Sequence, residues 1–260
     1  MKQPDWLEYH IADGVTAFST TRHGGVSKGN YAEFNVNEYC GDDKTCIEAN
    51  RMTLCRRLGI TTDRLVYPHQ VHGTVVKAIG PEWFSWSPNE RKEYLEGVDA
   101  VMTDLSEVCI GVSTADCIPV LLYDAQHHAC CAIHAGWRGT VARIVEEAVR
   151  AMVSVYQSEP QCLRAVVGPG ISLKNFEVGD EVYHAFDEAG FDMTRIAVRH
   201  AKWHIDLWEA NRLMLLEMGV TAQQIQVAGV CTYDQAIDFF SARRLGIASG
   251  RILTAIMLHP

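Results

Sequence analysis

The sequence predicts an α+β fold in which mixed β-sheets and helices pack as a layered sandwich. Runs rich in β-branched and other apolar residues, such as VDAVMTD and VCIGVSTADCIPVLLYD, mix with helical patterns without a strict β-α alternation. The sequence contains no internal repeat. Its 260 residues are enough for one sizeable core, so we expect a single domain over residues 1–260.

The composition is that of an ordinary globular protein, with 48% hydrophobic and 21% charged residues. A formal net charge of -9 argues against binding to nucleic acid or acidic membranes, because both need a positive protein surface. The first residues lack the basic flank and apolar core of a signal peptide, and no stretch approaches a membrane span, so we expect a cytoplasmic location. The nine cysteines follow no disulfide framework, and most should be reduced thiols.

The N-terminal part begins with a predicted strand over residues 15–20, followed by the Gly-rich polar loop TRHGGVSKGNY. Residues 44–58 have apolar residues at helical spacing, and Gly59 follows them as a stop signal. Two strand segments around a polar corner are expected in RLVYPHQVHGTVVKAI. The stretch GPEWFSWSPNERKEYLEG is rich in turn formers and aromatic residues, which predicts an irregular excursion.

The remainder of the chain predicts an alternation of buried strands and clear helices. Three strand-rich runs follow residue 98: VDAVMTD, VCIGVSTADCIPVLLYD and HACCAIHAGW. Apolar residues recurring every three and four positions predict the longest helix in TVARIVEEAVRAMVSVY. LRAVVGPGIS is a predicted strand that runs into a turn. VGDEVYHAFDEAG and DLWEANRLMLLEMG are predicted helices that end at glycines, and ILTAIML is the closing strand.

Three short stretches place chemically active side chains where a predicted strand meets a turn: PHQVHG, STADCIPV and AIHAGWRG. They contribute His72, Cys117 and His134, a set that would suit Zn(II) in tetrahedral geometry with one position open for catalysis. The same spacing also fits a cysteine and histidines that only pack in the fold. It fits equally a metal-free site in which Cys117 is a nucleophile and His134 its base.

Anionic ligands would need a local arginine cluster in so acidic a chain, because the arginine fork binds phosphate or carboxylate through two parallel hydrogen bonds. Four arginines lie beside Gly, Ser or Trp in predicted loops: Arg22, Arg138, Arg243 and Arg244. Each alone is equally consistent with a surface ion pair. His200 and His204 are four residues apart and would share a helix face, but their stretch lacks the glutamate of a metalloprotease motif, so we interpret them as surface or packing residues.

Taken in order, nine segments resemble the YfiH-like, laccase-domain family, historically described as polyphenol oxidases and later as purine nucleoside phosphorylases. The segments are STTRHGGVSKGNYAEFNV, PHQVHG, VDAVMTD, STADCIPVLLYD, AIHAGWRG, VGPGIS, NFEVGDEV, DLWEANRLML and DFFSARR. They span about residues 15–254 and leave only WFSWSPNERKEY without a family motif. The resemblance implies a fold related to that of deamidating-toxin cysteine hydrolases and a zinc site at His72, Cys117 and His134.

For activity, the resemblance implies phosphorolysis of adenosine, inosine, guanosine and methylthioadenosine, with adenosine deamination as a second reaction. Phosphorolysis passes through a ribosyl cation-like state, so the site needs a phosphate clamp, shelter from water and stabilisation of the departing purine. We expect Arg22 and Arg138 to form the clamp, helped by the N-terminus of the helix that follows His134. Further candidates for proton handling or substrate binding are Asn35, His69 and Asp116.

The older family name implies copper and oxygen chemistry, which the sequence argues against because it contains no His-X-His pair. Cu(II) could still bind adventitiously to the His-Cys-His set. Two other functions stay open. One is a Cys-His hydrolase or amidase acting on amide or peptidoglycan-precursor substrates, and the other is a purine-binding or metal-sensing module without turnover, which a closed four-ligand metal site would favour.

Overall fold

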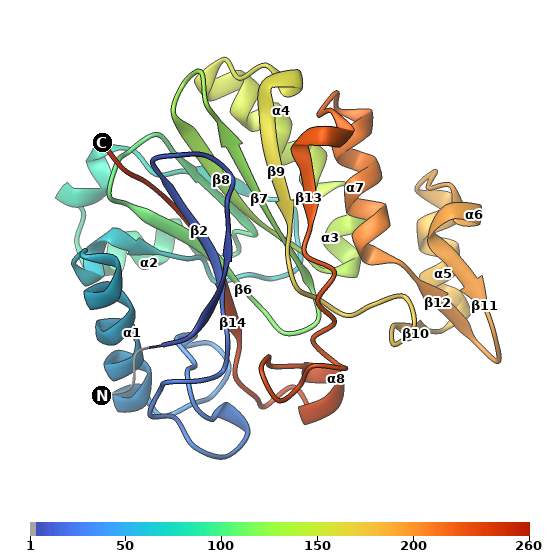
Figure 1. Ribbon diagram of the computed structural model, residues 1–260, viewed down its shortest axis with the longest axis horizontal. Coiled ribbons are helices and arrows are strands. Elements are labelled where there is room, and N and C mark those ends of the chain that lie inside the picture. The colour runs from blue at the N-terminus through green and yellow to red at the C-terminus, as the bar shows by residue number, and fades with distance from the viewer. Residues whose placement is uncertain (1–3) are drawn as a thin grey trace.

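The computed structural model describes residues 4–260, and its centre is a pair of β-sheets packed face to face (Figure 1). The first sheet has the strand order β1 (Trp6–Tyr9), β2 (Val15–Thr20), β14 (Ile252–Leu258), β6 (Cys109–Thr114) and β3 (Leu65–Val66). The second has the order β13 (Ile225–Val227), β9 (Leu163–Val167), β7 (Ile118–Asp124), β8 (Ala129–Ala135), β5 (Ala100–Thr103) and β4 (Val76–Ala78). Both sheets mix parallel and antiparallel pairs, which confirms the predicted α+β layered sandwich.

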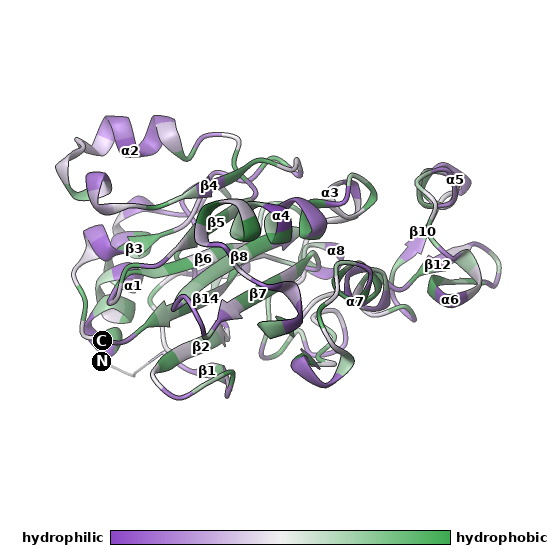
Figure 2. Ribbon diagram, turned by 90° about the horizontal axis from the view of Figure 1, so that it is seen from above, coloured by the Kyte–Doolittle hydropathy of each residue, from purple (hydrophilic) through white to green (hydrophobic). Residues whose placement is uncertain are grey.

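Strand β8 shows why the central strands are apolar without alternation. Its residues Cys131 and Ile133 pack toward the helices on the outer face, whereas Cys130 and Ala132 pack against the other sheet. A strand that is buried on both faces needs apolar residues at every position. Figure 2 shows the resulting concentration of hydrophobic residues in the central strands. His134 continues the series of Cys130 and Ala132 and therefore faces the space between the sheets at the end of the strand.

Helix α1 (Lys44–Leu58) covers the outer face of the first sheet and has the predicted bounds. The carboxylate of Asp43 accepts the Cys46 backbone N–H at its start, and Gly59 ends it in the left-handed region at φ 74°. The excursion predicted after β4 is more regular than expected. It contains η3 (Pro81–Ser85) and α2 (Pro88–Tyr94), and a reciprocal capping box between Ser87 and Glu90 starts α2.

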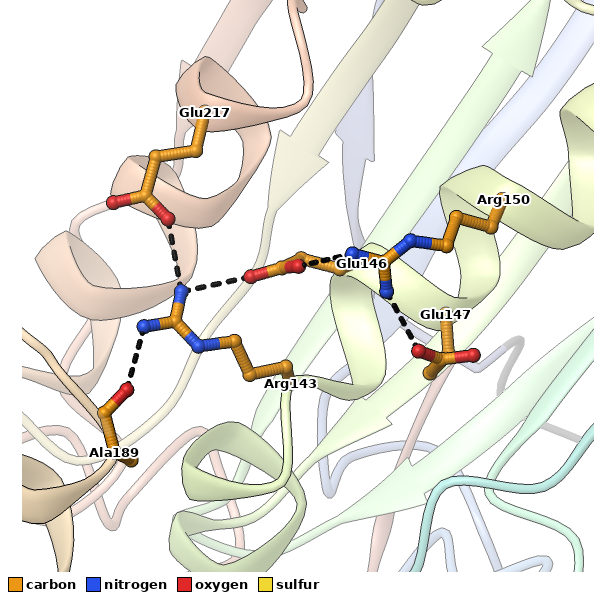
Figure 3. Close-up of polar contacts among 6 residues, drawn as sticks. All are labelled: Arg143, Glu146, Glu147, Arg150, Ala189 and Glu217. Atoms are coloured by element: carbon orange, nitrogen blue, oxygen red, sulfur yellow. Dashed lines mark hydrogen bonds and ion pairs between the residues drawn. The ribbon is translucent and has the colours of Figure 1, made fainter.

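The helix predicted as the longest in the chain is broken in two. It consists of α3 (Trp137–Val141) and α4 (Ile144–Tyr156), separated at Arg143, whose φ of 63° is left-handed. The Arg143 guanidinium is held by Glu146 at 2.7 Å, Glu217 at 2.9 Å and the Ala189 carbonyl at 2.8 Å (Figure 3). These contacts, rather than any glycine or proline, stabilise the break. Helix α4 and helix α7 (Leu207–Glu217) cover the outer face of the second sheet.

Residues 176–205 form an arm that projects to one side of the sandwich (Figures 1 and 2). The arm contains β10 (Glu177–Val178), α5 (Asp180–Glu188), α6 (Met193–Ile196), β11 (Ala197–Arg199) and β12 (Trp203–Ile205), with the strand order β10-β12-β11. The expectation that His200 and His204 share a helix face is wrong. His200 follows β11 in the turn of a hairpin and His204 lies in β12, because this stretch pairs as antiparallel strands.

The remaining short elements connect the layers. They are η1 (Gly29–Tyr31), η2 (Thr62–Arg64), η4 (Pro160–Cys162), η5 (Ala222–Gln224) and α8 (Ala242–Leu245). All nine cysteines lie within residues 4–260 and are free thiols. Across those same residues, every helix is too short or too polar to span a lipid bilayer.

Candidate functional site

A cavity of about 670 Å³ opens where β6 and β8 end. It lies within the range of about 300–1,000 Å³ that is usual for small-molecule sites. Its wall comes from segments that are distant in sequence but meet here: residues 37–40, 69–72, 113–117, 134–137, 171–176 and 242–251. All three stretches that sequence analysis singled out for chemistry therefore contribute to one cavity.

The expected metal ligands lie together in this cavity. One ligand atom from each of His72, Cys117 and His134 lies within 4.8 Å of the others. The Cys117 Sγ is 3.8 Å from the His72 Nε2, close to the roughly 3.6 Å between a thiolate and an imidazole nitrogen on a tetrahedral zinc. The antiparallel pairing of β7 and β8 produces part of this geometry, because it aligns Pro119 with His134 and so brings Cys117 beside the histidine.

Asp99, which the sequence analysis did not identify, organises both histidines. Its buried carboxylate accepts the His134 Nδ1–H at 2.7 Å, so the His134 Nε2 is the atom left for a metal. The same carboxylate accepts the backbone N–H groups of Val71, His72 and Gly73 at 3.2, 2.9 and 2.7 Å. The available sequence signal was an acidic residue directly before the buried strand AVMT.

The cluster is also electrostatically coupled. Burial disfavours a charged Cys117, but the charge and hydrogen bonds of His134 and His72 outweigh it and lower the pKa of the thiol to about 6. Burial likewise works against a charged His134, but the Cys117 thiolate and the Asp99 carboxylate raise the pKa of the ring to about 9. The neighbouring histidines thus favour the thiolate form of Cys117, which either a metal ligand or a nucleophile needs.

Two residues of the site have left-handed backbones that are uncommon outside glycine, His72 at φ 65° and Asp116 at φ 86°. For His72, the Asp99 contacts hold the loop. The Asp116 carboxylate lines the cavity and accepts the Thr232 hydroxyl at 2.7 Å and the Arg243 backbone N–H at 2.6 Å. Asp116 thus fixes the C-terminal segment that supplies one wall of the cavity.

The other two candidates for substrate contact differ in position. His69 lines the cavity, stacks on Tyr39 at 4.0 Å between ring centroids, and bonds Glu96 through Nδ1 at 2.7 Å. Asn35 is fully buried behind the wall and does not line it. Its side-chain oxygen accepts the Arg251 backbone N–H at 3.1 Å, so it supports the segment around Arg251.

The two arginines expected to clamp phosphate lie outside the cavity lining. Arg22 donates to the carbonyls of Ala32 and Ala236 at 2.7 and 2.8 Å, which occupies its guanidinium within the fold. Arg138 is exposed and stacks on the ring of Trp137. The helix that begins beside it has only five residues, so the long helix expected at the site begins elsewhere.

The arginines that do line the cavity are Arg243 and Arg251. Arg243 was one of the four loop arginines singled out from the sequence, whereas Arg251 was not. Strand β14 follows Arg251 directly and pairs with β6, aligning Ile252 with Thr114. This long-range pairing brings residues 243–251 to the cavity, and no local pattern in the sequence indicates it.

Comparison with known proteins identifies relatives along nearly the whole chain. The family described as Multi-copper polyphenol oxidoreductase laccase matches residues 16–259. A purine nucleoside phosphorylase of Bacteroides thetaiotaomicron is 48% identical over 248 residues, covering 94% of this chain and 92% of the relative. Adenosine deaminase RL5, from an unknown prokaryotic organism, is 42% identical over 247 residues, covering 94% of each. The crystal structure of YlmD from Geobacillus stearothermophilus matches with a TM-score of 0.90 at 29% identity, over 100% of both chains.

Proposed function

Because this chain belongs to the multi-copper polyphenol oxidoreductase laccase family, we propose that it is an enzyme that acts on purine nucleosides. Its main reaction is phosphorolysis of adenosine, inosine, guanosine and methylthioadenosine to the free base and ribose 1-phosphate. Adenosine deamination is the second reaction of the same cavity. The names of two relatives support these two activities, one a purine nucleoside phosphorylase and the other an adenosine deaminase.

The observation that carries the proposal is the His72, Cys117 and His134 cluster in the wall of a cavity of nucleoside size. The donor set and spacing fit Zn(II), and three protein ligands leave a fourth position for a ligand. A zinc ion bound there would supply Lewis-acid chemistry within the cavity. Cu(II) would also accept these donors, but residues 4–260 contain one such cluster, whereas multicopper oxidases need several imidazole sites.

The chain's own residues would prepare the cavity for a nucleoside. Asp99 holds the proton on His134 Nδ1, which orients that ring, and fixes the backbone of the loop that carries His72. Apolar side chains of Trp137, Ile171 and Phe176 line the wall and would shelter a purine and its reacting bond from water. His69 and Asp116 also line the cavity and would hydrogen-bond the base or the sugar.

A product assay tests this function directly. Protein of measured zinc and copper content is incubated with adenosine and with inosine, each with and without phosphate, and the products are separated by chromatography. We expect phosphate-dependent release of adenine and hypoxanthine, together with inosine formed from adenosine. Base release that does not depend on phosphate, or no reaction in any condition, contradicts the proposal.

A second candidate function is that of a Cys-His hydrolase or amidase. The specific observation in its favour is the order Asp99, His134, Cys117, in which a buried carboxylate holds a histidine beside a cysteine whose pKa is lowered to about 6. Phosphate distinguishes the two candidates, because phosphorolysis requires it and amide hydrolysis does not. Turnover of amide substrates by metal-free protein, without phosphate, would favour the hydrolase.

A further inference from the structure

We propose that inorganic phosphate binds in the cavity against Arg243, beside the end of β6, and not against Arg22 or Arg138. This inference rests on the proposed phosphorolysis, whose co-substrate must reach the same cavity as the nucleoside. The product ribose 1-phosphate carries the same group and would place its phosphate on the same residues. Four observations support this position.

First, both the backbone and the side chain of Arg243 are held by hydrogen bonds. Its backbone N–H donates to Asp116 at 2.6 Å, and its Nη1 donates to the carbonyl of Glu177 at 3.0 Å. Its Nε and Nη2 have no acceptor within residues 4–260, so one edge of the guanidinium fork is free for a ligand. An arginine that is already oriented loses little conformational entropy on binding an oxyanion.

Second, the arginines of the cavity wall carry unpaired charge. Neither Arg243 nor Arg251 forms an ion pair with a carboxylate in the described part of the chain. Arg251 directs its Nη atoms to backbone carbonyls at 2.6 to 3.0 Å, which neutralises no charge. In a chain of net charge -9, two such arginines in one cavity wall favour an anionic ligand.

Third, the two carboxylates near Arg243 do not block the anion, and Glu177 is already paired with Lys202 at 3.0 Å. Both Asp116 oxygens already accept hydrogen bonds, from the Thr232 hydroxyl and from the Arg243 backbone. The acid therefore orients the arginine through its main chain and leaves the guanidinium unpaired. Arg22 differs because it lies outside the cavity lining and two of its guanidinium nitrogens are bonded to the Ala32 and Ala236 carbonyls.

Fourth, two hydroxyls at the end of β6 lack partners. Ser113 and Thr114 line the cavity and are only 5% and 1% exposed, yet their side-chain oxygens make no hydrogen bond within residues 4–260. Buried hydroxyls are rarely left unpaired in folded proteins. Because consecutive strand residues point to opposite faces, one of these hydroxyls at most can turn toward a bound phosphate, whose oxygens are strong acceptors.

Steady-state kinetics on the zinc-loaded enzyme test the assignment, with phosphate varied at saturating inosine. We expect Arg243→Ala to raise the KM for phosphate by about 10- to 100-fold, the range for loss of hydrogen bonds to a charged partner. The KM for inosine should rise much less. Arg243→Lys keeps the charge but loses the fork, so its KM for phosphate should lie between those of the wild type and Arg243→Ala.

Arg244→Ala is the matched control. Arg244 is the next residue of the same short helix, but it stacks on Tyr233 and donates to the Tyr233 carbonyl outside the cavity lining. Its replacement should leave the KM for phosphate within twofold of the wild type. Arg22→Ala and Arg138→Ala complete the set. A KM for phosphate that rises in either of these and stays within twofold in Arg243→Ala overturns the assignment.

Direct binding separates this inference from the proposed reaction. Inorganic phosphate is titrated calorimetrically into the wild type and into Arg243→Ala without any nucleoside, and again with hypoxanthine present. Binding by the wild type that is lost in the variant supports the subsite even if no nucleoside is cleaved. Equal affinity in both proteins, or no affinity in the wild type under either condition, refutes it.

Discussion

A single buried carboxylate, Asp99, contacts both histidine-bearing segments of the cluster. One oxygen accepts from the His134 ring and the His72 backbone, and the other accepts from Gly73 and Val71. Only a group that accepts on both oxygens can serve all of these donors at once. The arrangement couples the orientation of the His134 ring to the path of the loop that carries His72.

We therefore expect Asp99→Asn to lower zinc affinity by about 10- to 100-fold, the usual effect of losing a hydrogen-bond partner of a metal ligand. In one orientation the asparagine would direct its NH2 at the Gly73 N–H, so two donors would face each other and that hydrogen bond would be lost. In the other it forces the His134 proton onto Nε2, where it blocks the metal. Chelator competition measures the affinity. Asp104→Asn is the control, because Asp104 is exposed and lies at the other end of β5 from Asp99. Its zinc affinity should match that of the wild type. Unchanged affinity in Asp99→Asn would contradict this role.

Cys117→Ala should remain folded but lose stoichiometric zinc and turnover together, because it removes the only sulfur donor of the cluster. Metal analysis, circular dichroism and the nucleoside assay on one preparation test this. Cys40→Ala is a suitable comparison, since Cys40 lines the same cavity but stands outside the cluster, and it should retain zinc. A folded Cys117→Ala protein with full zinc and full activity would refute the site.

The residue types alone predicted part of this site. His72, Cys117 and His134 stood out because each lies in a short stretch where a predicted strand meets a turn. Asp99 was not, because its partners lie 26 to 35 residues away and only the sheet pairing brings them together. The same limit applies to the arginines, since β14 must pair with β6 before residues 243–251 reach the cavity.

Among the elements, the break between α3 and α4 connects the arm to the sandwich. Arg143 bonds Glu146 in α4, Glu217 in α7 and the carbonyl of Ala189 just after α5 (Figure 3). Its guanidinium also stacks over the ring of Phe191. The opposite end of α5 follows β10 and the cavity residue Phe176. Arg143 therefore anchors the C-terminal end of α5, and through this helix it helps to position the cavity wall next to its N-terminal end.

Arg143→Ala should increase hydrogen exchange across residues 176–205 and raise the KM for nucleoside several-fold, with a smaller effect on kcat. Arg143→Gly should lose the same contacts but be more stable than the alanine variant by about 1 kcal/mol, because glycine adopts the left-handed backbone without strain. Arg150→Ala is the control, since Arg150 bonds only Glu146 and Glu147 of its own helix. Exchange in the arm that is unchanged in Arg143→Ala would refute the connection.

Local signals explain which elements were predictable. The strand at 15–20 and helix α1 match their predicted bounds. For α1, the apolar periodicity lies within the helix, and the capping residues Asp43 and Gly59 flank it directly. The break at Arg143 was missed because a long-range ion-pair network, not a helix-breaking residue, stabilises it. Helix α2 was missed although its capping box is local, since the dense turn formers around it predicted a loop.

In the molecule as a whole, the β7–β8 hairpin separates the site from a stabilising turn. Cys117 and His134 lie at the open end of the hairpin. At its closed end, next to the turn, Asp124 pairs with Ala129. Six residues of extended strand span about 20 Å. Asp124 is fully buried, and its carboxylate accepts the Gln126 and His127 backbone N–H groups and contacts the His127 ring at 2.8 Å. Changes at this turn should therefore alter stability without altering the site.

Burial works to raise the pKa of Asp124, but the His127 ring and the turn N–H groups outweigh it and lower the pKa below its ordinary value. The stabilisation is therefore complete above the unfolded-state pKa of about 3.9 and is lost as the pH falls through the lower folded value. Asp124→Asn should cost about 1 to 3 kcal/mol in urea unfolding at pH 7, and the deficit should shrink as the solution is acidified below pH 4. Zinc content and KM should match the wild type. Asp13→Asn, fully exposed, should show no deficit at either pH. A deficit in Asp124→Asn that is equal at both pH values would show that the ionised carboxylate is not what stabilises the turn.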